Sequence, residues 1–294
     1  MTTTAAASAA ARDLADRLEQ LEAVDGIARP IAKAVRDAVQ PGPAKDLLSG
    51  TPIGHALHPL LTDLPIGTWT SALLLDWLGG ADARGAADLL IGLGIASTVP
   101  AMATGLTEWA DSETASPPAR RVGLVHAATN LTATALFGAS LAARRGGARG
   151  TGKLLALAGA GALGAGGWLG GHLSYAQGLG VDRTAFEAGP EDWTPALPEA
   201  ELGEGALHVV DAGGVAVLVA RVDGELRAIA NRCSHRGGPL DEGELDGGCV
   251  TCPLHGSVFR LADGGVERGP AAYPQPSWRV RVQAGTIEVA PPER

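Results

Sequence analysis

The chain is poor in cysteine, in aromatic residues and in positive charge, and each shortage narrows what it can be. Its 294 residues include three cysteines, and aromatic residues make up 4%. An odd number of cysteines, all between Cys233 and Cys252, is a poor disulfide framework and is more typical of metal ligation. The net charge is −9 and no basic patch is present, which argues against a nucleic-acid partner.

Several motifs of well-known enzymes and exported proteins are also missing. The chain has no dinucleotide-binding glycine fingerprint, no P-loop and no nucleophile elbow. Its first residues lack the charged-then-apolar pattern of a secretion signal. Residues 1–49 are instead predicted as an N-terminal amphipathic helical segment, because Leu14, Leu18 and Leu21 recur at helical spacing.

Long apolar stretches are abundant in the middle of the chain. They cover about residues 60–78, 87–106, 122–142 and 154–173, and the last three contain almost no charge. Each approaches the ~20 residues needed to cross a bilayer. In the fourth stretch, Gly166 and Gly170 have the spacing of small residues that let helices approach closely in lipid. Residues 50–181 are therefore predicted as a four-helix transmembrane bundle of a multi-pass plasma-membrane protein; the alternative is a soluble bundle of buried helices.

The ionisable residues of these stretches gather at one end of the predicted bundle. Alternating the direction of the four spans puts His58, Glu108, His126 and His172 near one membrane face. Ionisable groups at membrane depth are functional candidates, and histidines on facing helices can hold cofactors. We therefore expect a site for haem, a quinone or a metal ion at this face. The alternative is that the four side chains lie at headgroup depth and bind water and each other.

The apolar region also resembles a known family. The stretches GHALHPLLTDLPIGTWTSALLLDWL and GGHLSYAQGLGVDR are similar to the small four-span bacterial membrane domain called DUF2231. The resemblance covers about residues 50 to 185. It supports the four-span topology and implies no particular chemistry.

The chain changes character at Asp182. Residues 182–197 are rich in proline and acidic residues and are predicted to be a linker. Residues 198–294 contain alternating apolar stretches separated by Asp-Gly and Gly turns, which is the pattern of β-hairpins. The part from Asp182 onward holds 18 acidic and 10 basic residues. We expect a small, acidic, all-β domain at the C-terminal end.

Two short motifs in this domain have the residue types of a metal site. Cys233 and His235 form C-x-H, and Cys252 and His255 form C-x-x-H, with sixteen residues between the two motifs. Two cysteines and two histidines can hold zinc tetrahedrally. However, each loop offers one ligand of each kind, as a [2Fe–2S] cluster with two histidine ligands requires. In that arrangement the cysteines bind one iron and the histidines bind the other. Zinc and a degenerate empty site are the alternatives.

Residues beside the ligands are expected to help bind the cluster. Gly238 and Gly256 let the backbone come close to the cluster sulfides, because they have no side chain. Ser257 is positioned in sequence to donate a hydrogen bond to a bridging sulfide. These three residues complete the predicted cofactor-binding set.

The stretches CSHRGGPLDEGEL and CPLHGSVFRLADGGV resemble the Rieske family over about residues 195 to 291, and both ligand motifs are present. The respiratory members of that family have two further loop cysteines that form a disulfide, which this chain lacks, so Cys249 is expected to be a packed free thiol. Phe259 stands where high-potential members have a tyrosine. With fewer hydrogen bonds to the cluster and acidic surroundings, the resemblance implies a ferredoxin-like centre of low to intermediate potential.

Together these features predict a membrane-anchored, ferredoxin-like protein that carries single electrons as a component of an oxidoreductase system. The expected partners are a redox protein or a quinone, together with membrane lipid. Electron exchange with the predicted membrane-face site is part of this hypothesis. Two alternatives are a ferredoxin module that serves a separate oxygenase and uses the spans as a passive anchor, and a redox-sensing module.

The sequence gives opposing indications for the membrane side. Arg144, Arg145 and Arg149 lie at the end opposite the histidines, so the positive-inside rule would place the cluster outside the cytoplasm. A cluster without a disulfide, on a chain without a secretion signal, favours the cytoplasm. On balance, the Rieske-like domain is predicted on the cytoplasmic face.

Overall fold

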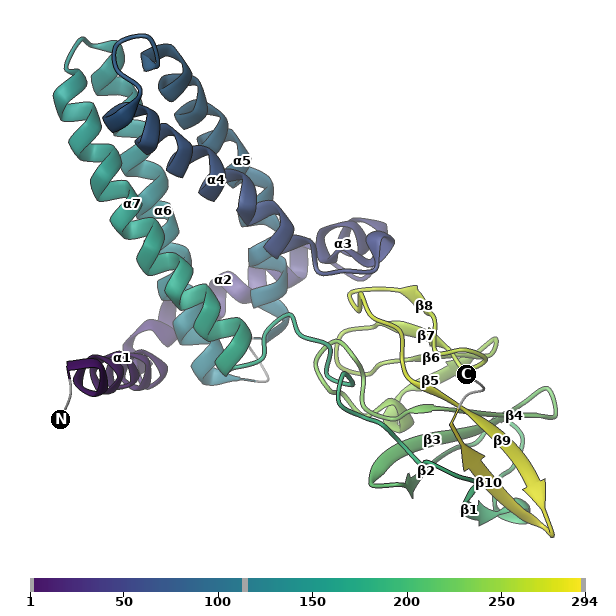
Figure 1. Cartoon of the computed structure of the whole chain (residues 1–294). Coiled ribbons are helices and arrows are strands. Elements are labelled where there is room, and N and C mark those ends of the chain that lie inside the picture. Colours follow the sequence, from purple (N-terminus) through teal and green to yellow (C-terminus); the bar gives the residue numbers. More distant parts are fainter. Residues whose placement is uncertain (1–2, 113–115, 292–294) are drawn as a thin grey trace. The chain divides into compact units, whose positions relative to one another are not determined.

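The computed structural model describes residues 3–112 and 116–291 (Figure 1) and divides into two compact units. The helical unit comprises Met1–Ala38 and Leu57–Leu179. The β unit comprises Val39–Ala56 and Gly180–Arg294. Each unit is described by itself.

Six of the helices belong to the helical unit. They are α1 (Thr3–Glu19), α2 (Asp25–Ala38), α4 (Leu57–Leu78), α5 (Arg84–Ser112), α6 (Pro117–Arg145) and α7 (Arg149–Gly171), and a π-helical turn, His172–Ala176, continues α7. The four predicted apolar stretches fall in α4, α5, α6 and α7. Among the described residues, three helices are long and apolar enough to cross a membrane: Arg84–Ser112, Pro117–Arg145 and Arg149–Ala176. That α4 also crosses remains a prediction.

The apolar core of the long helices is built around one aromatic pair. Trp69 of α4 and Phe137 of α6 stack with ring centroids 4.2 Å apart and an interplanar angle of 14°. The indole Nε1 of Trp69 donates to the carbonyl of Ile91 on α5 at 3.2 Å. Gly94 leaves the space that this ring occupies, because a Cβ there would lie 2.2 Å from the indole nitrogen. The core of these helices can therefore be filled by few aromatic residues, because small residues such as Gly94 let the helices pack closely around them.

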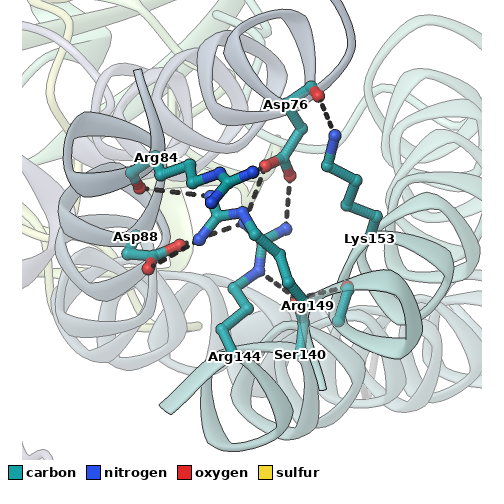
Figure 2. A network of polar contacts seen from close by, with 8 residues as sticks. Asp76, Arg84, Asp88, Ser140, Arg144, Arg149 and Lys153 are labelled. Carbon is teal, nitrogen blue, oxygen red and sulfur yellow. Dashed lines mark hydrogen bonds and ion pairs between the residues drawn. The ribbon is translucent and has the colours of Figure 1, made fainter. Parts of the chain in front are cut away.

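A buried charge network ties the four long helices together at the α4 C-terminal end (Figure 2). Arg144 of α6 donates to Asp76 of α4 at 2.8 Å, and both side chains are 0% exposed. Asp88 of α5 accepts from Arg144 at 3.0 Å and from Arg149 of α7 at 3.1 Å. Lys153 of α7 donates to the backbone carbonyl of Asp76. Because the carboxylates and guanidinium groups neutralise one another, the charges can remain inside the bundle.

The β unit contains two antiparallel sheets. The strands are β1 (Thr194–Pro198), β2 (Leu207–Ala212), β3 (Val215–Val222), β4 (Glu225–Ala230), β5 (Glu244–Asp246), β6 (Cys249–Thr251), β7 (Val258–Arg260), β8 (Val266–Arg268), β9 (Ser277–Gln283) and β10 (Thr286–Ala290). One sheet has the order β1-β10-β9-β4-β3-β2, and the other has the order β5-β6-β7-β8. This arrangement confirms the predicted all-β fold.

Strand β3 shows how the alternation in the sequence builds two apolar cores. Val217 and Val219 belong to one buried cluster, whereas Leu218 and Ala220 belong to the other. Successive side chains of a strand point to opposite faces, so β3 contributes to both cores. The turn after β3 has positive φ at Asp223 (52°) and Gly224 (76°), as a tight two-residue hairpin requires.

The unit boundaries differ from those expected from the sequence. Residues 182–197, predicted as a linker, include β1, which pairs with β10, and the backbone N–H of Arg183 donates to the carbonyl of Ser234 at 2.9 Å. This segment therefore belongs to the β unit.

Residues 39–56, which contain α3 (Pro43–Ser49), also belong to the β unit. The Asp46 carboxylate accepts from the backbone N–H of Gly269 at 2.9 Å. The Thr51 hydroxyl donates to the carbonyl of Ala271 at 2.9 Å. Both partners lie more than half the chain away in sequence, so local patterns could not reveal these contacts.

Candidate metal centre

The first ligand loop, residues 231–243 between β4 and β5, holds Cys233 in a tight turn. The backbone N–H of Cys233 donates to the carbonyl of Gly238 at 2.8 Å. The Cys233 carbonyl accepts from the N–H of Gly237 at 2.8 Å, and Gly237 has a φ of +76°. This left-handed conformation favours glycine and explains the residue at that position.

The second ligand loop, residues 252–257 between β6 and β7, repeats the same turn. The N–H of Cys252 donates to the carbonyl of Ser257 at 2.7 Å. The Cys252 carbonyl accepts from the N–H of Gly256 at 3.0 Å, and Gly256 also has a φ of +76°. Two loops of equal geometry therefore each present one cysteine.

The two cysteine thiols meet in the buried interior. Cys233 is 1% exposed and Cys252 is 2% exposed, and their side chains hydrogen-bond to each other. Each sulfur also accepts from the backbone N–H groups of the residues two and three positions further along its loop. The hydrogen bond between the thiols lowers the pKa of Cys252 to about 7 and raises the pKa of Cys233 well above its ordinary value. All four N–H groups thus point at the two sulfur atoms that would bind iron as thiolates.

The two imidazoles form a second pair. The rings of His235 and His255 have centroids 5.1 Å apart and stand at 90° to each other. Burial holds the pKa of His235 well below its ordinary value, and the positive charge of Arg236 acts in the same direction. His235 is therefore neutral at pH 7, which is the form that binds metals.

The donor set fits two irons better than one zinc. Within residues 3–112 and 116–291, no group of three or more His, Cys, Asp or Glu side chains converges as a single metal ion requires. The ligands instead form one thiol pair and one imidazole pair, which is the division of a two-histidine [2Fe–2S] cluster. Gly238 allows close approach here, because a Cβ on it would lie 3.0 Å from the Cys252 sulfur.

The charges nearest the site differ from the acidic surroundings expected from the sequence. Arg236, Lys45 and Arg183 all act electrostatically on His235, and each is a cation. Burial lowers the pKa of Arg183, as do its neighbours Arg236 and Arg232. Nearby positive charge stabilises the reduced, more negative state of a cluster and so raises its potential. The acidic residues of this unit therefore do not support a low reduction potential of the cluster. That prediction now depends on Phe259, which has no hydroxyl to donate to the cluster.

Phe259 and Cys249 lie on neighbouring strands beside the loops. Phe259 of β7 is fully buried in the same apolar cluster as the two ligand cysteines, where its ring offers no hydroxyl. Cys249 of β6 is half-buried and faces Arg260 across the ladder. All three cysteines, each among the described residues, are free thiols.

Ser257 has a buried hydroxyl in the second ligand loop. It is fully buried, and its Oγ accepts from the N–H of Ala271 at 3.0 Å. Because the oxygen accepts this bond, the hydroxyl hydrogen can donate to a cluster sulfide.

Ser257→Ala is expected to lower the reduction potential of the cluster by roughly 60–130 mV. A hydrogen bond to a charged group contributes about 1.5–3 kcal/mol, and 59 mV corresponds to a tenfold change for one electron. An EPR-monitored redox titration measures the shift. Ser257→Thr keeps the hydroxyl and serves as the matched control. Equal potentials for the alanine variant and the wild type would show that this hydroxyl does not reach the cluster.

The four residues predicted at the membrane face make different contacts in the structure. His58 and His126 lie close enough to interact electrostatically. The Nε2 of His172 instead lies 2.8 Å from Glu19 of α1 and binds that helix to α7. Glu108 is half-buried near the C-terminal end of α5. In the part of the chain that the structure describes, these four residues do not converge as one metal site.

Three charged residues near the ligands were missed by the sequence analysis. Arg236 directly follows His235, so its position in the ligand motif could have drawn attention to it. Arg183 lay in the predicted linker, and Lys45 lay in the N-terminal segment. Nothing local connects those two residues with the ligand loops.

Comparison with known proteins matches the two units to two families. The Rieske [2Fe-2S] domain matches residues 192–279, and the family described as "Predicted membrane protein (DUF2231)" matches residues 54–183. The anthranilate 1,2-dioxygenase ferredoxin subunit of Burkholderia cepacia is 34% identical over 105 residues, covering 35% of this chain and 95% of the relative. The 3-phenylpropionate/cinnamic acid dioxygenase ferredoxin subunit of Escherichia coli K12 is 38% identical over 99 residues, covering 33% and 92%.

Other similarities are partial. The chain spans 15% of the length of apoptosis-inducing factor 3 from mouse, to which it is 30% identical over 89 residues, or 30% of this chain. Among solved structures, the ferredoxin of carbazole 1,9a-dioxygenase from Nocardioides aromaticivorans IC177 is 29% identical. The match covers 35% of this chain and all of that chain, with a TM-score of 0.33.

Proposed function

The chain belongs to the Rieske [2Fe–2S] domain family and has a DUF2231 membrane domain as its second part, and on this premise we propose that it is a membrane-anchored carrier of single electrons. The observation that carries the proposal is the pair of matching loops. Each loop presents one cysteine and one histidine and directs backbone N–H groups at its cysteine sulfur. A bound cluster supplies one-electron redox chemistry. The surrounding residues hold its ligands in place and keep water from the thiols.

The ligand loops also offer a contact surface for a redox partner protein. Leu254, directly before the ligand His255, is 50% exposed, and Arg232 beside Cys233 is exposed as well. An exposed apolar residue next to a ligand gives a partner a short path to the site. The neighbouring cations favour a partner with an acidic face.

A second function has specific support. Two of the similar proteins are named as ferredoxin subunits of dioxygenases, and the chain covers more than nine-tenths of each. The β unit would then reduce a separate oxygenase while the helical unit holds it at the membrane. Both functions require the same one-electron centre, and they differ in whether the helices take part in electron exchange.

The cytoplasmic face remains the proposed location of the β unit. Cys249, a free thiol outside the ligand pairs, and a cluster site without a disulfide suit a reducing compartment. One of the arginines at the opposite membrane face, Arg144, lies buried inside the bundle, so it is not a loop charge of the kind that sets orientation.

Reductive titration of the full chain in mild detergent tests the proposal. We expect one electron per chain and a low-temperature EPR signal typical of a two-histidine [2Fe–2S] cluster. We also expect the protein to stay with the membrane fraction after alkaline carbonate extraction. Stoichiometric zinc without an EPR signal would overturn the electron-carrier function, and release by carbonate would overturn the membrane anchor.

A further inference from the structure

The helical hairpin of α4 and α5 holds a histidine in a defined orientation. The Nδ1 of His58, near the start of α4, lies 2.9 Å from the carbonyl oxygen of Ala101 on α5. The ring lies directly against Gly105, four residues further along α5, where a Cβ would be 2.6 Å from Cε1 of the imidazole. A glycine is therefore needed for the ring to lie this close to α5.

The hairpin of α6 and α7 repeats this arrangement. The Nδ1 of His126, in the first third of α6, lies 2.9 Å from the carbonyl oxygen of Gly166 on α7. Its ring lies against Gly170, again four residues further on, where a Cβ would be 3.1 Å from Cε1. Each hairpin thus has one histidine, one carbonyl acceptor and one glycine in equivalent positions.

The hydrogen bonds fix the tautomer of both rings. A carbonyl oxygen only accepts, so Nδ1 carries the proton in each imidazole and Nε2 keeps its lone pair. Asn130 Nδ2 lies 3.3 Å from both ring nitrogens of His126. Because these two distances are equal, the Asn130 nitrogen lies over the face of the imidazole ring. It is therefore off the axis of the Nε2 lone pair. A histidine that donates through one nitrogen to a carbonyl and binds through the other is the usual form of a metal ligand.

The number of ligands limits the kind of metal centre. His58 and His126 interact electrostatically, and no third His, Cys, Asp or Glu joins them as a metal ligand within the described residues. A zinc or copper ion held by the protein would need three or four such ligands. A haem iron needs only two axial ligands, because the porphyrin supplies four nitrogens.

At this level the two hairpins are joined through α5 and α6: Leu106 and Trp109 share an apolar cluster with Leu124, and the Trp109 indole donates to the carbonyl of Arg120 at 3.0 Å. The buried apolar cluster that connects α4 with α6 and α7 begins, on α4, at Trp69, eleven residues after His58, and no other such cluster of described residues includes α4. The apolar packing of α4 against α6 and α7 therefore starts beyond the level of His58.

We propose that the helical unit binds one haem, with the Nε2 atoms of His58 and His126 as the two axial ligands of its iron. In each hairpin, a carbonyl and a glycine four residues further along hold the imidazole in the orientation needed for axial ligation. The other two residues predicted at the membrane face, Glu108 and His172, are not part of this site. His172 is hydrogen-bonded to Glu19. The site lies wholly in the helical unit and does not depend on the function of the iron–sulfur cluster.

Haemin added to the purified full chain in detergent tests this site. We expect one haem per chain by pyridine haemochrome assay, with a sharp Soret band and a low-spin ferric EPR signal. His58→Ala and His126→Ala should each give a high-spin signal or lose the haem, and added imidazole should restore the low-spin signal. His172→Ala and His55→Ala are the matched controls and should bind haem like the wild type.

Folding defects are separated from ligand loss in two ways. Helical circular dichroism of each variant in detergent reports whether the helical unit is folded, and the cluster signal per chain reports the same for the β unit. His126→Met keeps an axial ligand and should retain the haem at a higher reduction potential, because a methionine ligand raises the potential of haem iron. Wild-type protein with a full cluster that binds no haemin would overturn the proposal. Unchanged spectra in both alanine variants would also overturn it.

Discussion

Cys252→Ala is expected to abolish the [2Fe–2S] cluster. Cys252 is 2% exposed, its sulfur hydrogen-bonds to the Cys233 sulfur, and that bond lowers the pKa of its thiol to about 7. Without it, one iron keeps a single protein thiolate. We expect less than about 5% of the wild-type EPR signal and visible absorption per chain, because an iron with an incomplete ligand set is not retained. Iron and sulfide analysis of the purified full chain measures the loss.

Cys249→Ala provides the matched control for this experiment. Cys249 is also a free cysteine of the same unit, but it is half-buried on β6 and has its place in the sheet opposite Arg260. The variant should keep the wild-type iron content and signal. A Cys252→Ala protein that retained a normal cluster would show that the two matching loops are not the ligand site.

The ligand residues could be predicted because each motif is local. Cys233 and His235 lie in one turn, and Cys252 and His255 lie in another, so the spacing alone brings a thiol and an imidazole to each loop. The sequence also indicated the strands, because alternation such as that of β3 reflects two buried faces. Hence the fold class, and the pairing of a cysteine with a histidine in each loop, followed from short-range patterns.

Features formed by distant segments could not be predicted in this way. Lys45 acts on His235 only because Asp46 and Thr51 bind to residues near the end of the chain. Helical spacing likewise placed His58 and His126 at the same face, but their carbonyl acceptors lie on other helices. Contacts between distant segments depend on how the elements pack, and the spacing of residues along the chain does not reveal that packing.

Asp76 is the clearest case of a residue whose role depends on packing. In sequence it is a single acid near the end of an apolar stretch, where ending the helix is a sufficient explanation. In the structure it accepts hydrogen bonds from Arg144 and Arg149, and its backbone carbonyl accepts from Lys153 (Figure 2). A carboxylate at the end of one helix thus holds two other helices.

Arg144→Met is expected to destabilise the helical unit by about 3–5 kcal/mol, since it removes the closest partner of a buried carboxylate and leaves only the longer contact with Arg149. Arg144 and Asp76 are both 0% exposed, and the remaining partner Arg149 lies 3.3 Å from the Asp76 carboxylate. Unfolding of the full chain in mixed detergent micelles, followed by helical circular dichroism, measures the change. An exposed ion pair gives the comparison: Lys33→Met, which removes the contact with Asp37, should cost less than about 1 kcal/mol.

The double variant Asp76→Leu/Arg144→Met distinguishes a buried charge from lost packing. With both charges replaced by apolar groups, no unpaired ion remains, and Asp88 keeps its contact with Arg149 at 3.1 Å. Replacing a whole buried pair in this way is often neutral or stabilising. The double variant should therefore recover most of the stability that Arg144→Met loses. If it is as unstable as the single variant, the network acts through the shape and hydrogen bonds of its side chains, and the charge itself is not what holds the four helices together.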